Sequence, residues 1–392
     1  MPGLHAILSA SSSKRWMTCP PSARLEEKLK ERFGDKSSPF AEEGTRAHSL
    51  SELKLQKELG LINDFSYKAQ RAGLELTGPI DNEMEWATNV YVDTIMQKYY
   101  AAKKTCSDAQ LFIEQRLDFS KWVPHGFGTG DAVIVSDSIL EVCDLKYGKG
   151  VPVLAEGNPQ ARCYGLGALV EHGDLYGFPQ VRNTIIQPRL DSITEETLTR
   201  EELVEWAETE LQPKAELAWK GEGEYKAGEH CRFCAARALC YHRAVECMSI
   251  FQSGMQSPGV LPDEEIPRIL EVADIAEAWI KDIREYARSQ ALKGQQWHGF
   301  KLVAGRRPPR KWTDVEAVVD QMSRAGYTDE QIYKPREIIT VGEAEKLMGK
   351  SAFRAILGSF SHQNEGAPTL VPESDKRVAI NSTEAAFADL VE

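Results

Sequence analysis

The cysteines constrain the fold of this chain more than any other sequence feature. The 392 residues include eight cysteines, and four of them fall within seventeen residues, as Cys231, Cys234, Cys240 and Cys247. A chain of this length can bury a hydrophobic core without disulfide bonds. An uneven cysteine cluster in such a chain therefore favours a bound metal over disulfides.

The overall charge limits the possible partners. The chain carries 59 acidic and 47 basic residues, for a net charge of -12, so no global positive field attracts nucleic acid. A nucleic-acid role would require a local basic groove or a metal. The sequence has no apolar run of about 18 residues. Its first 16 residues lack the charge pattern and apolar length of a secretory signal. These features predict a cytoplasmic protein with no membrane partner.

The pattern of the first 250 residues predicts a core of mixed secondary structure. Helices are expected over residues 22–33, 42–59, 78–103 and 199–221, and from Asn158-Pro159 to about residue 171. Strands are expected over residues 110–119, 129–136, 138–148 and 180–187, with a short turn at Asp137-Ser138. This order predicts an α/β fold with one mixed central sheet flanked by helices.

The residue pattern of the sequence changes near residue 250. This change predicts two parts, residues 1–250 and an accessory region of residues 251–392. The second part is expected to contain a long helix over residues 263–294, a basic segment and an extended tail beyond about residue 359. The basic segment holds Lys301, Arg306, Arg307, Arg310, Lys311 and Trp312. Such a run offers phosphate contacts and a stacking ring, or it is a solvated surface loop.

The strand that ends in Asp144 and Lys146 is the strongest indication of a chemically active site. Side chains alternate along a strand, so Asp144 and Lys146 share a face. The predicted hairpin can bring Asp131 close to Asp144, and two adjacent carboxylates suit Mg²⁺ or Mn²⁺. The alternative interpretation is an ion pair at a strand end. Glu114, which precedes the hairpin, is a candidate for a residue that contacts the metal ligands rather than the metal.

The order of four short motifs points to a known family. Along the chain they are Gly44-Thr45-x-x-His48-x-x-x-Glu52, Gly130-Asp131, Asp144-x-Lys146 and Gln160-x-x-x-Tyr164. This succession resembles the PD-(D/E)xK nucleases of the RecB/AddB type, which include the CRISPR-associated adaptation nucleases. The resemblance implies a restriction-endonuclease-like fold over roughly residues 9–250.

The resemblance also implies roles for individual residues. His48, Asp131 and Asp144 would bind the metal, and Lys146 would be catalytic. Gln160 and Tyr164 would orient the site and contact the nucleotide backbone. Cys19, Cys231, Cys234 and Cys240 would hold a [4Fe-4S] cluster that joins the start of the chain to the end of the core. A structural Zn²⁺ is the alternative, with His230, His242 or Cys247 as fourth ligand.

The function implied by the resemblance is that of a metal-dependent deoxyribonuclease. It would be an exonuclease that acts on DNA ends and prefers single strands, in recombination or repair, and a phage origin would suit it. A single-strand-binding or recombinase protein is an expected partner. The alternative is a catalytically inactive DNA-binding or assembly protein that keeps the nuclease fold and the cysteine-bound metal.

Overall fold

The structure is a computed structural model of the chain, and it describes residues 6–33, 39–173, 178–253, 263, 266–303, 314–333 and 340–360. Two compact units divide the chain, Met1–Gln295 and Gln296–Glu392. The expected division near residue 250 falls inside helix α9 (Tyr241–Ser253), within the first unit. The assignment of separate roles to residues 1–250 and 251–392 stays a prediction.

A mixed sheet forms the centre of the first unit, as the sequence predicts, and it has five strands. Its strands lie in chain order, and only the β3–β4 pair is parallel. The strands are β1 (Gln110–Asp118), β2 (Phe127–Val135), β3 (Ile139–Leu145), β4 (Gln180–Gln187) and β5 (Ser192–Thr199). Strand β5 was not expected from the sequence, because its run of Thr and Glu lacks the apolar alternation of a half-buried strand.

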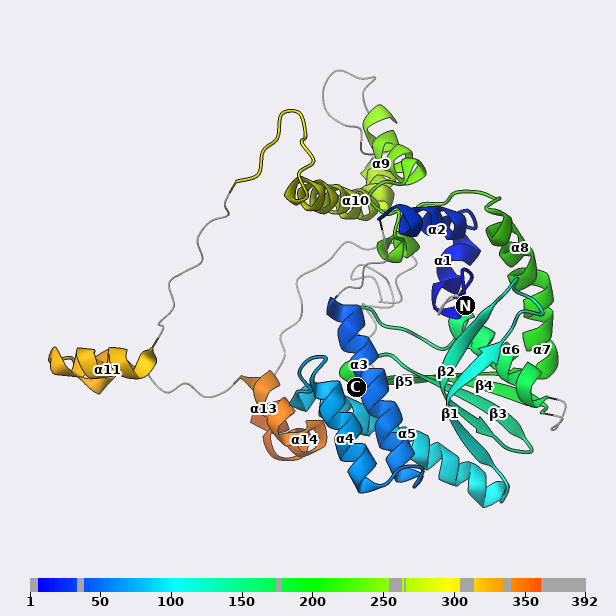
Figure 1. Ribbon diagram of the computed structural model, residues 1–392, viewed down its shortest axis with the longest axis horizontal. Coiled ribbons are helices and arrows are strands. Elements are labelled where there is room, and N and C mark those ends of the chain that lie inside the picture. The colour runs from blue at the N-terminus through cyan, green and yellow to red at the C-terminus, as the bar shows by residue number, and fades with distance from the viewer. Residues whose placement is uncertain are drawn as a thin grey trace, which may run out of the picture. The chain divides into compact units, whose positions relative to one another are not determined.

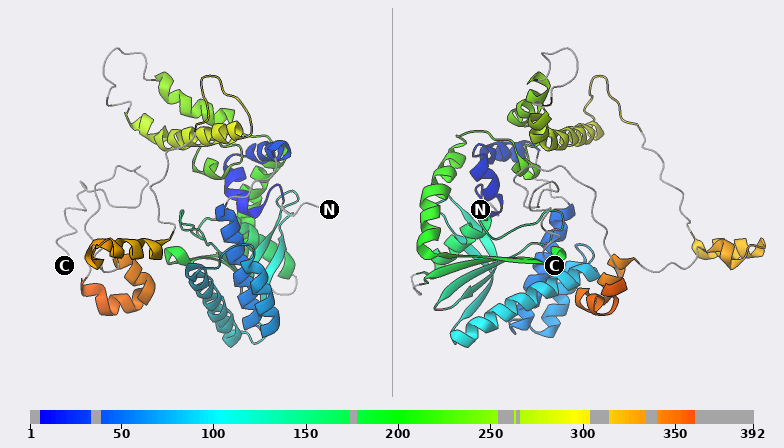
Figure 2. Two further views of the ribbon diagram at one scale, coloured as in Figure 1. Left: turned by 60° about the vertical axis from the view of Figure 1, so that its left-hand side comes forward. Right: turned by 180° about the vertical axis from the view of Figure 1, so that it is seen from behind.

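Helices cover both faces of this sheet (Figures 1 and 2). On one face α6 (Pro159–His172) packs against β1, β3 and β4, together with α7 (Arg200–Trp206) and α8 (Gln212–Lys220). On the other face lie α3 (Pro39–Glu58) and α5 (Asn82–Thr105), with α4 (Asp64–Glu75) beside α3. The strand side chains alternate between two cores: Leu140 and Val142 are buried under α6, whereas Cys143 and Leu145 are buried under α5.

Helix α6 begins where the sequence predicts, because the Asn158 side chain accepts hydrogen bonds from the backbone N–H groups of Gln160 and Ala161. Two glycines allow it to lie very close to the sheet. A Cβ atom on Gly167 would sit 2.8 Å from the Leu117 Cβ, and one on Gly128 would sit 2.6 Å from the Tyr164 ring. The Tyr164 ring therefore rests directly on strand β2.

The start of the chain packs against a segment near the end of the first unit. Helices α1 (Ser13–Thr18) and α2 (Ser22–Phe33) contact α8, and α1 also contacts the short helix η4 (Glu229–Phe233). The Arg15 guanidinium donates to the Phe233 carbonyl at 3.1 Å, and the Ala235 N–H donates to Glu26 at 2.6 Å. Asp282 on α10 (Ile266–Leu292) pairs with Arg243 at 2.7 Å, which joins α10 to the same region.

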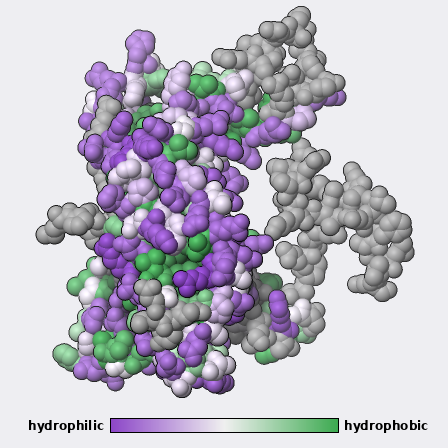
Figure 3. Space-filling view, turned by 90° about the vertical axis from the view of Figure 1, so that its right-hand side faces the viewer, coloured by the Kyte–Doolittle hydropathy of each residue, from purple (hydrophilic) through white to green (hydrophobic). Residues whose placement is uncertain are grey.

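The described residues of the second unit are mainly helical, in α11 (Val315–Arg324), α12 (Asp329–Ile332), α13 (Val341–Met348) and α14 (Lys350–Leu357). Of the basic segment, Lys301 is exposed, whereas Arg306, Arg307, Arg310, Lys311 and Trp312 lie outside the described residues, as does the expected tail beyond residue 360. Hydrophilic side chains dominate the face seen in Figure 3. No helix within the described ranges is long and apolar enough to cross a membrane.

Candidate functional site

Three carboxylates form a row across strands β1, β2 and β3. Ala132 pairs with Cys143, so the next positions outward, Asp131 and Asp144, face each other on β2 and β3. On the other side of β2 the register places Glu114 of β1 opposite Asp131. Three acids in adjacent positions repel one another unless cations or protons compensate their charge. The row is therefore a strong candidate for a cation site.

Glu114 lies in an unusual backbone conformation within β1. Its φ of 49° belongs to the left-handed region, which a residue with a side chain rarely adopts in a strand. Burial, together with the charges of Asp131 and Glu52, raises the pKa of Glu114 to about 7. The structure thus makes Glu114 a direct member of the acidic row, whereas the sequence suggested only a supporting position.

His48 reaches the same row from helix α3. Its Nδ1 lies 3.1 Å from Asp131 Oδ1, and the ligand atoms of His48, Glu114 and Asp131 all lie within 4.8 Å of one another. Burial lowers the pKa of His48, but the adjacent Asp131 carboxylate outweighs it and raises the pKa to about 9. Without a metal, a proton on the imidazole therefore balances part of the acidic charge at neutral pH.

Asp144, Lys146, Gln160 and Tyr164 form a connected polar chain beside this row. Lys146 Nζ lies 2.7 Å from Asp144 Oδ2 and donates to Gln160 Oε1 at 2.9 Å. The Gln160 amide group in turn donates to Asp144 Oδ1 at 3.4 Å and to the Tyr164 hydroxyl at 3.3 Å. The i, i+4 spacing on α6 places Gln160 and Tyr164 on one face of the helix. All six residues proposed for the nuclease site thus lie in one region.

The Asp144 carboxylate is buried beside a cation. Burial raises its pKa, and the neighbouring Lys146 opposes that shift. The buried Oδ2 atom lies 2.7 Å from the Lys146 ammonium, which compensates part of the charge of the carboxylate. Its position beside an imidazole and two further carboxylates fits a hard divalent cation.

Arg189, which the sequence did not suggest, connects elements that carry residues of the site. Its buried guanidinium donates to Glu83 of α5 at 2.8 Å and lies 3.4 Å from Glu43 of α3. It also stacks over the ring of Tyr147, the residue after Lys146, at 4.5 Å from the ring centroid. Arg189 therefore ties the helix that bears His48 to the segment that bears Lys146. Its partners are far apart in sequence, so no local motif indicates it.

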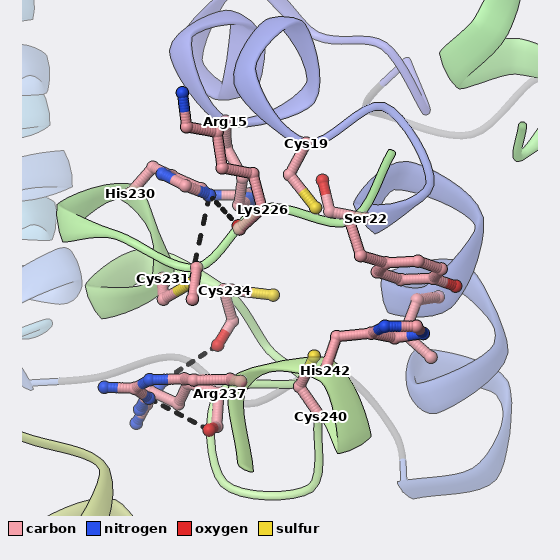
Figure 4. Close-up of a pocket in the computed structure, with 14 residues that line it drawn as sticks. Arg15, Cys19, Ser22, Lys226, His230, Cys231, Cys234, Arg237, Cys240 and His242 are labelled. Carbon is pink, nitrogen blue, oxygen red and sulfur yellow. Dashed lines mark hydrogen bonds between the residues drawn. The ribbon is translucent and has the colours of Figure 1, made fainter. Parts of the chain in front are cut away.

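The four cysteines proposed as cluster ligands line a single pocket. Figure 4 shows the sulfur atoms of Cys19, Cys231, Cys234 and Cys240 around this cavity. Cys19 follows α1, Cys231 lies in η4, and Cys234 and Cys240 flank a short turn region before α9. Residues more than 200 positions apart therefore meet here, because α1 packs on η4.

The surroundings of this pocket combine buried thiols with cationic side chains. Burial raises the pKa of Cys19 and Cys231, and it raises that of Cys234 to about 12. Bound metal needs these groups as thiolates, so it must displace their protons. Arg15, Arg237 and Arg243 also line the cavity. Carboxylates already pair with all three, because Arg15 contacts Glu26, and Arg237 and Arg243 contact Asp282.

The residues named for the zinc alternative are placed differently. His230 Nε2 lies 2.8 Å from the Lys226 carbonyl and 3.9 Å from Cys231 Sγ. The His242 ring lines the pocket and stacks on Tyr225 with centroids 3.9 Å apart. Cys247 is fully buried on α9 and does not line the pocket, but it lies near Arg243 and Cys231, which do.

The fold and these two sites define a mixed α/β protein with a buried acid–lysine site and a cysteine-lined pocket. Residues 5–378 match the family described as "Protein of unknown function (DUF2800)", and the chain belongs to this family. Among solved structures the chain is similar to one titled "Crystal structure of SSO0001", with 14% identity over 55% of this chain and 94% of that chain, at a TM-score of 0.21.

Proposed function

We propose that this protein is a metal-dependent deoxyribonuclease of the PD-(D/E)xK superfamily, similar to the RecB/AddB type. The observation that carries the proposal is the convergence of His48, Glu114 and Asp131 from three separate elements, with their ligand atoms within 4.8 Å of one another. Asp144 lies on the neighbouring strand, outside this group, with the ammonium of Lys146 at 2.7 Å. An imidazole, several carboxylates and a fixed lysine are the groups that metal-assisted phosphodiester hydrolysis requires.

His48, Asp131 and Asp144 are proposed to hold Mg²⁺ or Mn²⁺, with Glu114 beside them. A divalent cation supplies Lewis-acid activation of water and of the phosphate group when it is bound. Lys146 stabilises the negative charge that develops on the phosphate, because Gln160 and Asp144 hold its ammonium in place. Gln160 and Tyr164 present an amide and a hydroxyl to the nucleotide backbone.

The cysteine pocket is proposed to hold a structural [4Fe-4S] cluster, because hydrolysis needs no electron transfer. Four thiols that line one pocket support a group bound by four cysteines. A structural Zn²⁺ ion is the alternative.

The family resemblance further supports exonuclease action on DNA ends, with a preference for single strands, in DNA recombination or repair. A cytoplasmic location, a phage setting and a single-strand-binding or recombinase partner belong to the same proposal. They rest on the ordered motifs around His48, Asp131, Asp144 and Gln160.

The direct test is hydrolysis of 5′- and 3′-labelled DNA strands by the purified full chain with Mn²⁺. We expect degradation by the wild type and loss of degradation in Asp144→Asn, which keeps the size of the side chain. Asp137→Asn, in the exposed β2–β3 turn, is the matched control and should retain activity. Equal hydrolysis by Asp144→Asn and the wild type would eliminate the proposed site, and hydrolysis by neither would eliminate the proposed activity.

A further inference from the structure

A second pocket lies between helix α2 and the end of helix α8. Its volume is about 270 Å³, and its lining includes Arg24, Lys28, Lys220 and Tyr225. No acidic residue is among the described residues that line it. In a chain with a net charge of -12, three cations around one cavity are a local departure from the overall charge. The cavity is slightly smaller than the ~300–1,000 Å³ typical of sites for drug-sized ligands.

The cations differ in how firmly they are held. Arg24 is fixed, because its Nε donates to the Trp219 carbonyl at 2.6 Å and its Nη1 pairs with Glu27 at 2.7 Å. Its guanidinium also lies 4.2 Å from the centroid of the Trp219 ring. This leaves Nη2 without a partner among the described residues. A guanidinium held in this way is well suited to phosphate recognition.

Lys28 and Lys220 provide the exposed charges of the pocket. Both side chains are exposed, and neither forms an ion pair with another described residue. Gly221 gives the pocket its shape, because its φ of +73° ends helix α8 and a Cβ atom there would lie 2.9 Å from Arg24 Cγ. The arrangement offers donors and positive charge from Arg24, Lys28 and Lys220, which are the groups that bind phosphate oxygens.

We propose that this pocket binds the phosphate groups of a nucleic-acid strand. The inference rests on the proposed function and adds to it a contact for the substrate backbone outside the acidic site. Leu25 and Tyr225 line both this pocket and the cysteine-lined pocket. The group held by the cysteines therefore also supports one wall of the phosphate site.

The test measures binding of a fluorescein-labelled oligo(dT) strand to the full chain in EDTA, so that hydrolysis cannot occur. Binding is followed by anisotropy from about 50 to 200 mM NaCl, where each phosphate contact contributes a slope of about -0.7 in log K against log salt for single strands. The double variant Lys28→Gln/Lys220→Gln should bind more weakly, and the magnitude of its slope should fall by about 1.4. The matched control is Lys68→Gln/Lys104→Gln, which removes two exposed helical lysines elsewhere and should keep the wild-type slope.

Three results would overturn the proposal: no strand binding by the wild type, equal slopes for the pocket variant and the wild type, or an equal loss in the control. Displacement of the strand by dTMP at the same phosphate concentration would show a site for free nucleotides and would also overturn it. Strand binding by the wild type without any Mn²⁺-dependent hydrolysis would contradict the proposed function alone.

Discussion

Asp131 and Asp144 face each other across strands β2 and β3, and the N–H of Leu145 donates to Asp131 Oδ2 at 2.7 Å. This hydrogen bond leaves Asp131 Oδ1 to contact His48 at 3.1 Å. One carboxylate is thus fixed between the backbone of one neighbour and the imidazole of another. Both contacts come from the protein itself and hold the Asp131 carboxylate in one orientation within the acidic row.

Binding of Mn²⁺ should release protons and strengthen as the pH rises. A metal ligand must be deprotonated, but the pKa of His48 is raised to about 9 and that of Glu114 to about 7 in the metal-free protein. Between pH 7 and 9 we expect one proton from His48 per ion bound, and about a tenfold gain in affinity per pH unit. Calorimetry in buffers of different ionisation enthalpy measures both quantities. An affinity that stays constant from pH 7 to 9 would contradict His48 as a ligand.

Lys146→Gln should reduce DNA hydrolysis by about 10²–10³-fold, the usual cost of removing one group that stabilises charge in a transition state. Binding of Mn²⁺ should change little, because Lys146 is not a ligand. Lys149→Gln is the matched control, since Lys149 is exposed and pairs only loosely with Glu83, at 3.4 Å. Initial rates at saturating Mn²⁺ measure the effect. A variant with more than a tenth of the wild-type rate would argue against a catalytic lysine.

Cys19→Ser should lower the iron and acid-labile sulfide content of the purified protein and reduce its thermal stability. The cause is the loss of the one thiol ligand that the start of the chain contributes to the pocket. Cys106→Ser is the control, because Cys106 is equally buried but contacts Asp108, away from the pocket. Elemental analysis also tests the cluster itself. Wild-type protein that contains zinc and no iron would contradict it.

Gly167→Ala should lower the free energy of unfolding by about 1–3 kcal/mol, the usual cost of overpacking a close contact. The added Cβ would lie 2.8 Å from the Leu117 Cβ and 3.0 Å from its carbonyl carbon. Gly73→Ala in α4 is the control, because nothing lies within 4 Å of its added Cβ. It should raise the free energy of unfolding by about 0.5–1 kcal/mol through its better helix propensity. Urea denaturation of both variants measures the two effects, and equal midpoints would contradict close packing of α6.

Local sequence patterns were sufficient for many elements of the fold. Helix α2 and strand β4 have the bounds that the sequence predicts, 22–33 and 180–187. Helix α4 was not predicted, and it lies at the periphery, since none of its residues is buried. The polar edge strand β5 was also missed, because its run of Thr and Glu lacks apolar alternation. Sequence patterns therefore predict the buried elements better than the peripheral ones.

The candidate site shows a second limit of sequence reasoning. Asp144 and Lys146 share a face because strand alternation is local, and a short turn fixes the register that places Asp131 opposite Asp144. By contrast, residues 119–126 separate β1 from β2. A connection of that length does not fix the register, so the position of Glu114 beside Asp131 could not be inferred.

The contact between Arg15 and the Phe233 carbonyl joins residues 218 positions apart. A ribosome adds about 5–20 residues per second, so roughly 10–45 s separate the synthesis of these two partners. The first helix is therefore synthesised before the segment that completes its contacts, and its contact with Phe233 forms only after the whole sheet has been made.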